Sequence, residues 1–205
     1  MAKPADRRVQ RTHRMLKDAL ISLILEKGYE SVSVQDIVER ADVGRSTFYA
    51  HFADKEELLY SSLDDLRAFL VEQQRQGRAV ARAAPGRADE RLFAFSLPFL
   101  EHALEHLDLY RAMVGRKSGA IVQQRMQKML ADLVRDDLKA LARRAGDPSL
   151  PLDALVEFTV GGFFAVLTWA LERRARPGPN DTDDIFRRLT LPGVRRAFGL
   201  EDVAG

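Results

Sequence analysis

A short polar and aromatic segment near residue 50 carries side chains that can bind DNA. Arg45 has a planar guanidinium that can make paired hydrogen bonds to a guanine. Thr47 can contact a thymine methyl group or a phosphate, and the hydroxyl, imidazole and ammonium groups that follow can reach phosphates. Each residue type is common on protein surfaces, so the prediction rests on their grouping. The candidate DNA contacts in this segment are Arg45, Ser46, Thr47, Tyr49, His51 and Lys55.

A helix that enters the major groove needs a second helix behind it to hold its angle. Residues 34–41 show the spacing expected of that second helix, and Ser33 precedes them as a predicted N-cap. A turn at residues 42–44 then leads into the predicted recognition helix at residues 45–51. The apolar residues expected to form the small core of this pair are Ile37, Val38, Ala41, Val43, Phe48 and Phe52.

Positive charge is concentrated at the front of the chain. The 205 residues carry a net charge of +2, which is too small to make the whole molecule a binder of polyanions. The first 17 residues hold six basic residues and one acid, a net charge of +5. This segment can lie along DNA phosphates, and a solvated, disordered terminus is the equally simple alternative.

The rest of the chain has a helical pattern, with apolar residues three and four positions apart and no convincing run of alternating strand residues. The sequence therefore predicts an all-α fold. Residues 76–89 lack large apolar residues apart from Val80 and contain Pro85-Gly86, which predicts a loop. Helices are predicted at about residues 10–27, 34–41, 45–51, 55–76 with Asp54 as its N-cap, 88–106 with a bend or restart at Pro98, 109–114, 118–144, 152–176 and 181–190.

The chain contains no cysteine, which excludes a disulfide framework and a thiolate metal site. Its N-terminus opens with charged residues and lacks the apolar run of a signal peptide. We therefore expect a cytoplasmic protein.

Several short motifs fall together between residues 33 and 58: Ser33, Asp36-Ile37, Ala41-Asp42-Val43-Gly44 and Thr47-Phe48-Tyr49-Ala50-His51-Phe52-Ala53-Asp54-Lys55-Glu56-Glu57-Leu58. In these residues the chain resembles the DNA-binding domain of the TetR family of one-component transcriptional regulators. The close match covers about residues 10–60, and beyond it only helix order and length fit the family. The resemblance implies an N-terminal three-helix, helix-turn-helix DNA-binding domain over residues 1–55. A larger helical ligand-binding and dimerisation domain is then expected over residues 56–205.

The resemblance also implies roles for individual positions. It makes residues 45–51 the recognition helix, and Tyr49 and Lys55 phosphate contacts. The other implied backbone contacts are Ser33 and Val34 at a helix start, with Arg11 and Thr12 near the beginning of the first helix.

Two positions depart from the family pattern. Asp42 stands where the family usually has a turn glycine, and Gly44 where it usually has a serine or threonine cap. Aspartate tolerates a left-handed conformation, and glycine is an acceptable N-cap, so we expect the motif to form at a cost of a few tenths to about 1 kcal/mol. Gly44 lacks the hydroxyl that could have bound a phosphate.

Aromatic residues and methionines gather in the C-terminal part of the chain. At helical spacing they form a core more often than a ligand wall, because pockets are few. Pro98 favours a nearby cavity, since a broken helix packs less completely. The candidate pocket residues are Phe95, Phe99, His102, Tyr110, Met113, Met126, Phe163 and Trp169.

The most hydrophobic segment is residues 152–176. It is marginally short for a membrane span and carries Glu157. A helix that is apolar on nearly every face more simply lies between its own domain and a second subunit. The family resemblance implies that this helix and residues 181–190 form a dimer interface, and two-fold symmetry then predicts a palindromic operator. The candidate interface residues are Phe164, Leu167, Thr168, Leu171, Ile185, Phe186 and Leu189.

Other constellations do not support catalysis or a cofactor. His102 and His106 have a spacing that can hold zinc, but a third ligand is not identifiable. Residues 115–119 lack the order of a phosphate loop, and the acidic pairs at 64–65, 136–137 and 183–184 are interpreted as solvated faces or helix starts. We therefore expect neither an enzyme nor a bound metal.

These observations predict a homodimeric repressor that a small apolar or amphipathic ligand releases from a palindromic operator. The alternative is a ligand- or metal-sensing helical dimer that activates transcription or for which DNA binding is secondary.

Overall fold

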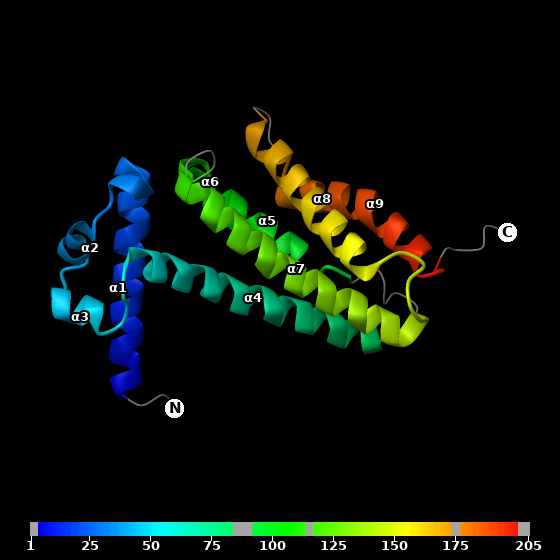
Figure 1. The fold of residues 1–205 in the computed structure, drawn as a ribbon, viewed down its shortest axis with the longest axis horizontal. Helices are drawn as coiled ribbons and strands as arrows, with labels where there is room; N and C mark the ends of the chain where they lie inside the picture. The colour runs from blue at the N-terminus through cyan, green and yellow to red at the C-terminus, as the bar shows by residue number, and fades with distance from the viewer. Residues whose placement is uncertain (1–3, 84–91, 114–116, 174–176, 201–205) are drawn as a thin grey trace. The chain divides into compact units, whose positions relative to one another are not determined.

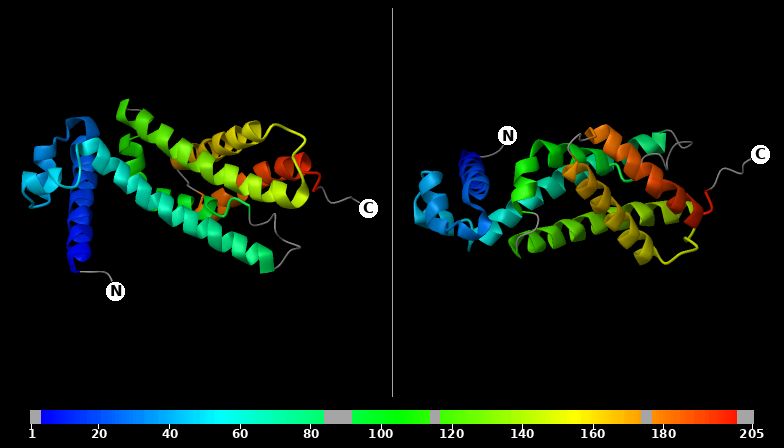
Figure 2. Two further views of the ribbon diagram at one scale, coloured as in Figure 1. Left: turned by 60° about the horizontal axis from the view of Figure 1, so that its bottom comes forward. Right: turned by 90° about the horizontal axis from the view of Figure 1, so that it is seen from above.

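The computed structural model describes residues 4–83, 92–113, 117–173 and 177–200, and every regular element among them is a helix (Figures 1 and 2). The predicted all-α fold is confirmed.

Two compact units make up the chain. One contains Met1–Arg67 with His106–Gln124, and the other contains Ala68–Glu105 with Arg125–Gly205. Two long helices, α4 (Lys55–Ala83) and α7 (Lys117–Ala145), contribute residues to both units. The predicted boundary after residue 55 lies inside the first unit, at the first residue of α4.

The first unit is built on α1 (Pro4–Lys27), against which α2 (Val34–Arg40) and α6 (Leu107–Met113) pack (Figure 1). Proline suits the first helical position because that position needs no N–H donor. The helix begins six residues before the predicted start at Gln10, so the basic segment is helical from Pro4 onward instead of disordered. The largest fully buried side chains of this unit are Phe48, Leu16, Leu20, Ile24, Ile37 and Leu58.

Two caps define the start of α2 and of α4. A turn of 3-10 helix, η1 (Tyr29–Ser31), follows α1, and Ser33 then caps α2: its hydroxyl accepts from Asp36 N at 3.2 Å while its own N–H donates to the Asp36 carboxylate at 2.7 Å. At α4, the Asp54 carboxylate accepts from Glu57 N at 2.7 Å. Both predicted caps are confirmed.

In the second unit α9 (Pro179–Ala197) packs against both α5 (Ser96–Glu105) and α8 (Leu152–Glu172) (Figures 1 and 2). α5 begins at Ser96, and Pro98 is its third residue, where a missing N–H breaks no helical hydrogen bond. A new helix thus starts beside Pro98, as predicted. The rest of the predicted helix, from Ala88, lies partly outside the described residues.

Two helices of this unit run further than the sequence predicts. α4 continues from the predicted end at Gln76 to Ala83, because Gln74 donates to Leu133 O at 2.7 Å and holds the helix against α7. α9 continues through Pro192 to Ala197. One helical hydrogen bond is lost at that proline, but Val194 and Ala197 are buried and keep the last turns packed. α8 ends at Glu172, short of the predicted Arg176, and residues 174–176 lie outside the described part.

Candidate DNA-binding surface

A buried phenylalanine sets the orientation of α3 (Arg45–Tyr49). Phe48 is completely buried, and its ring lies 5.9 Å from that of Phe52. α3 has only five residues, so burying the Phe48 side chain turns the opposite side of the helix toward solvent. Arg45, Ser46 and Tyr49 are exposed, with 57% of Tyr49 accessible, and Thr47 is half-buried. The structure thus brings together on one surface the four residues of α3 predicted to contact DNA.

The turn between α2 and α3 contains both departures from the family pattern. Asp42 has a φ of 53°, in the left-handed region, as its position in the turn predicts. Val43 N donates to Val38 O at 3.0 Å, which closes the turn onto α2. Gly44 is the N-cap of α3 and provides no side-chain hydrogen bond, so the predicted weak cap is present.

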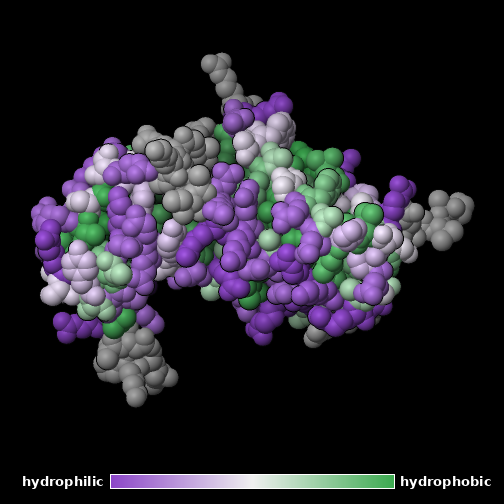
Figure 3. Space-filling model, in the orientation of Figure 1, coloured by the Kyte–Doolittle hydropathy of each residue, from purple (hydrophilic) through white to green (hydrophobic). Residues whose placement is uncertain are grey.

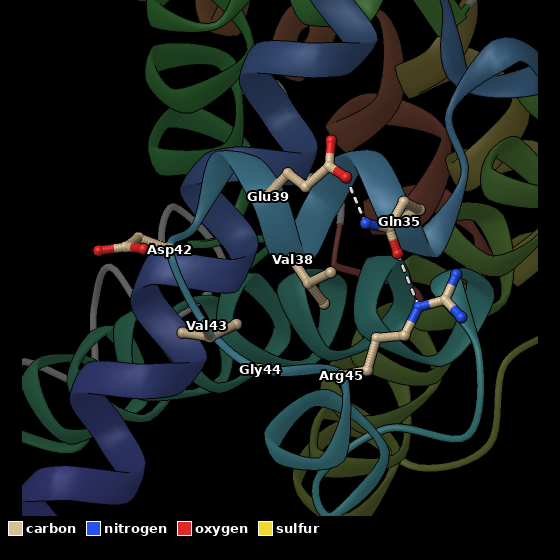
Figure 4. Close-up of a pocket in the computed structure, with 7 residues that line it drawn as sticks. All are labelled: Gln35, Val38, Glu39, Asp42, Val43, Gly44 and Arg45. Carbon is tan, nitrogen blue, oxygen red and sulfur yellow. Dashed lines mark hydrogen bonds between the residues drawn. The ribbon is translucent and has the colours of Figure 1, made fainter.

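An open hollow lies beside this turn and is lined by side chains of α2 and α3 (Figure 4). Arg45 donates from Nε to Gln35 Oε1 at 2.7 Å, and the Gln35 amide donates in turn to the Glu39 carboxylate. Gln35 is not among the DNA contacts predicted from the sequence. The only feature of the sequence that could have indicated a role for Gln35 is its spacing from Glu39, because residues four apart share one face of a helix.

The start of α2 holds two further predicted contacts, Ser33 and Val34. Ser33 is exposed, but its hydroxyl and amide are engaged with Asp36 in the cap described above. Lys27 lies 2.8 Å from the Asp36 carboxylate and, together with the two Ser33 hydrogen bonds, holds the pKa of Asp36 well below its usual value. Because the pair is exposed to solvent, it orders the α1–α2 junction without adding much stability.

Two predicted phosphate contacts have other partners in the structure. Lys55 donates to Tyr29 O at 3.1 Å and to Val32 O at 2.8 Å, and its ammonium lies 4.5 Å from the centre of the Tyr29 ring. An ammonium has three N–H donors, so at most one remains for a phosphate. The main contact of Lys55 is therefore with the segment that joins α1 to α2.

His51 packs edge-on against His13 of α1, with ring centroids 4.8 Å apart. Burial lowers the pKa of His13 below its usual value, and the nearby His51 and Lys17 lower it further. Nε2 of His13 is buried and has no hydrogen-bond partner among the described residues. His51 is thus half-buried beside α1, while a phosphate contact from it stays a prediction.

The basic helix α1 presents the remaining predicted contacts. Arg11 is exposed, whereas Thr12 is half-buried and its hydroxyl donates to Arg8 O at 3.1 Å. Lys17 donates to Ser61 O at 3.1 Å and lies 2.5 Å from Asp65, so its charge is already paired. The positive charge of α1 that faces solvent therefore comes from its N-terminal half.

The aromatic residues predicted to line a pocket mostly form the core of the second unit. Phe95, Phe99 and Phe163 are buried, and the Phe163 ring lies 5.8 Å from Phe95 and 5.2 Å from Phe99. Phe186 lies 5.2 Å from Phe163 and completes this aromatic cluster. The rings meet edge to face, the arrangement that aromatic pairs prefer.

The other predicted pocket residues are not all placed with this cluster. His102 and Met126 are half-buried in the second unit, whereas Tyr110 belongs to the first, where burial raises its pKa. Trp169 is 37% exposed, with the Arg173 guanidinium 4.7 Å from its ring centre. The side chain of Met113 lies outside the described residues.

The predicted dimer-interface residues divide between the inside and the outside of the second unit. Phe164, Leu167, Leu171 and Phe186 are buried within their own chain, so these four cannot lie on a free face in this structure. Helical periodicity is the reason, because one side of each helix must cover the aromatic cluster. Thr168 and Leu189 are exposed and Ile185 is half-buried.

The large exposed apolar residues of α8 and α9 are Phe158, Trp169 and Leu189, which we call the apolar face. Phe158 and Leu189 are 63% and 67% exposed, and Phe158 is not among the interface residues predicted from the sequence. Apolar surface is visible along α8 in Figure 3. Among the described helices, α8 is long and apolar enough to cross a membrane by length and composition alone, and 44% of its apolar stretch is buried in the chain.

One acidic pair contains a carboxylate that is buried, contrary to the prediction, and another contains one that is half-buried. Asp137 is buried, with Arg78 Nε at 2.7 Å and Phe93 N at 3.0 Å, and Asp183 accepts a hydrogen bond from Ser96. Burial raises the pKa of both carboxyls, partly offset by these hydrogen bonds. Phe93 has a φ of 59°, so Asp137 holds a strained turn before α5.

The two histidines considered as zinc ligands do not share a helix. α5 ends at Glu105, and His106 lies in the turn before α6. Within the part of the chain that the structure describes, no group of three or more histidine, aspartate or glutamate side chains is arranged to hold a metal ion.

Residues 16–61 match the family of bacterial regulatory proteins described as the tetR family. This region of the chain is therefore a TetR-type DNA-binding region. The matched residues include α2, α3 and the turn between them, which form the surface described above.

Two curated relatives share this region. An uncharacterised HTH-type transcriptional regulator of Bacillus subtilis, YxbF, is 37% identical over 71 residues, which are 34% of this chain and 19% of the relative. The A-factor receptor protein of Streptomyces griseus is 33% identical over 97 residues, which are 47% of this chain and 33% of the relative. The match thus spans a third or less of the curated relatives.

The whole fold also has a relative among solved structures. A TetR-family transcriptional regulator of Syntrophomonas wolfei superposes with a TM-score of 0.73 at 18% identity, covering 96% of this chain and 99% of that one. At this identity the likeness concerns the fold alone.

Proposed function

We propose that the protein is a homodimeric transcriptional repressor that inserts α3 into the major groove of a palindromic operator. One observation carries the proposal: the burial of Phe48 fixes α3 so that Arg45, Ser46 and Tyr49 are exposed together. A guanidinium and two hydroxyls on one helix suit base edges and phosphates. The exposed basic N-terminal half of α1 supplies the additional charge that attracts a DNA backbone.

The apolar face of α8 and α9 supports the dimer. Large apolar groups that are mostly exposed on two adjacent helices favour association with a matching surface. A second copy of the chain provides that surface through a two-fold axis. Two symmetric copies of α3 then predict two half-sites that are inverted repeats of each other.

The aromatic cluster supports a small apolar or amphipathic effector. Ligand sites are mostly apolar, and four phenylalanines of the second unit gather in one cluster: Phe95, Phe99, Phe163 and Phe186. The A-factor receptor protein is named for a ligand. An effector releases DNA only to the extent that it binds the DNA-incompetent state more tightly. A protein with these partners acts in the cytoplasm.

A binding titration tests the proposal. The probe is duplex DNA from the promoter region beside the protein's own gene, measured by gel shift and by fluorescence anisotropy at several salt concentrations. We expect salt-dependent, sequence-specific binding in which Arg45→Ala lowers the sequence preference and Tyr49→Ala lowers the affinity. If neither wild-type binding nor an effect of these two substitutions is seen, the regulator interpretation is wrong.

The sign of regulation needs a separate measurement. Deleting the gene should raise transcription from the bound promoter if the protein represses it. A fall in transcription would instead identify an activator and would leave the DNA-binding proposal intact.

A further inference from the structure

Gln35 of α2 forms a side-chain bridge to the first residue of α3. Its Oε1 accepts from Arg45 Nε at 2.7 Å, and its Nε2 donates to the Glu39 carboxylate. All three side chains are exposed and line the hollow of Figure 4. The bridge therefore joins the two helices at the surface where DNA binding is proposed.

The donors and acceptors of this bridge admit one arrangement. The arginine Nε can only donate, and a carboxylate can only accept. Reversing the Gln35 amide would place two donors together at Arg45 and two acceptors together at Glu39, so the two neighbours set its orientation. Glutamate cannot donate at this position, and methionine can neither donate nor accept strongly, although both resemble glutamine in length.

We propose that Gln35 is a positioning residue that makes Arg45 read a guanine with its two terminal nitrogens. This inference rests on the proposed DNA-binding function. The Gln35 amide occupies Nε and excludes the approach that pairs Nε with one Nη. Figure 4 shows both Nη atoms on the side of the guanidinium opposite Nε, and two such terminal nitrogens can meet O6 and N7 of one guanine.

Pre-organisation is the physical gain. An exposed arginine has many rotamers, and binding must select one of them at an entropic cost. Holding Nε before DNA arrives reduces that cost and also penalises any base that the two Nη atoms cannot contact. Gln35 thus acts through Arg45. Direct reading of a base by Gln35 is the competing possibility, and it requires the amide to leave both Arg45 and Glu39.

The test compares base preferences of full-length variants. Duplexes selected from a randomised library by the wild-type protein define the preferred sequence, and Arg45→Ala identifies the base pair that Arg45 reads. Gln35→Met should lower the preference for guanine at that same base pair about five- to tenfold, while binding to non-specific duplex changes less than about twofold. Gln35→Glu keeps an acceptor for Nε and should retain most of the preference. Gln123→Met, an exposed glutamine on α7, is the matched control.

A double-mutant cycle separates positioning from direct contact. In the Arg45→Ala background, Gln35→Met should have no further effect at that base pair. Additive effects, or a lost preference at a different base pair, would overturn the inference in favour of direct reading. Uniform loss of affinity for all sequences would show a merely structural role and would also overturn it. Failure of the wild type to select any sequence contradicts the proposed function itself, which is a distinct outcome.

Discussion

The α2–α3 surface and the aromatic cluster of the second unit both depend on buried phenylalanines, yet they differ in how much chemistry is visible in the sequence. In the first, Phe48 is buried and its neighbours Arg45 and Tyr49 are exposed within one short helix. In the second, Phe163 and Phe158 lie on one helix with opposite exposure. A local motif thus reveals its outward face, whereas a uniformly apolar helix does not.

The largest expected effect on stability is the loss of a buried ring of α8, and an exposed ring of the same helix provides the comparison. Phe163→Ala should destabilise the protein by about 3–5 kcal/mol, because it leaves a cavity among packed aromatic rings. Phe158→Ala, five residues earlier and 63% exposed, should change the unfolding free energy of the monomer by less than about 0.5 kcal/mol. Urea denaturation of both variants measures the difference.

The same two variants of α8 also test the proposed dimer. Sedimentation equilibrium of Phe158→Ala should show weaker self-association than wild type. An unchanged association constant for that variant would mean that the apolar face is not where two copies meet. A small stability loss in Phe163→Ala would instead indicate that the ring lines a cavity that tolerates truncation.

A smaller effect is expected at the buried carboxylate. Asp137→Ala removes the acceptor for Arg78 and for the strained Phe93 backbone, and should cost about 2 kcal/mol, less than a fully buried pair because Arg78 is partly exposed. Asp136→Ala, at the exposed neighbouring position, should have an effect within about 0.5 kcal/mol. Thermal and urea unfolding of both variants measure the two changes in unfolding free energy. Equal changes would show that the burial of Asp137 has no energetic consequence.

The two caps of the helix pair give a still smaller comparison. Ser33→Ala should destabilise the first unit by about 1 kcal/mol, since it removes the hydroxyl of the α2 cap. Gly44→Ser should stabilise it by a few tenths of a kcal/mol, because a Cβ at Gly44 meets its nearest atom at an ordinary 3.7 Å and the backbone already has cap geometry. Circular dichroism melts provide the measurement, and destabilisation by Gly44→Ser would refute the second expectation.

The smallest effect is expected from pH at α1. The pKa of His13 is lowered in the folded protein, so the unfolded chain binds the proton more tightly. Stability from the neutral imidazole is therefore complete above the usual histidine pKa of about 6.5 and is lost as pH falls through the lower folded value. Urea unfolding between pH 7.5 and 5 should show a shallower pH dependence for His13→Gln than for wild type.

Most of the fold could be predicted because its signals are local. The ends of α7 agree with the sequence to within one residue, and the caps at Ser33 and Asp54 were identified by residue type. The errors fall where a local stop signal competes with packing. α4 passes Gln76 because Gln74 is held by α7, and α9 passes Pro192 because its last turns are buried.

The candidate site was predicted less completely. The exposed residues of α3 follow from the motif, but the Lys55 contacts with Tyr29 O and Val32 O join positions more than twenty residues apart. Gln35 was missed because its role depends on Arg45 lying beside it in space. Neither contact has a signature in the neighbouring sequence.

By itself, the sequence determined the all-α fold and the helix-turn-helix, because hydrophobic period, caps and turn residues act over a few positions. The tertiary structure decided which side of α8 is buried, which of Asp136 and Asp137 is desolvated, and which of the basic residues remain exposed. These outcomes depend on which helices pack together, and packing brings distant residues into contact at distances that no local spacing specifies.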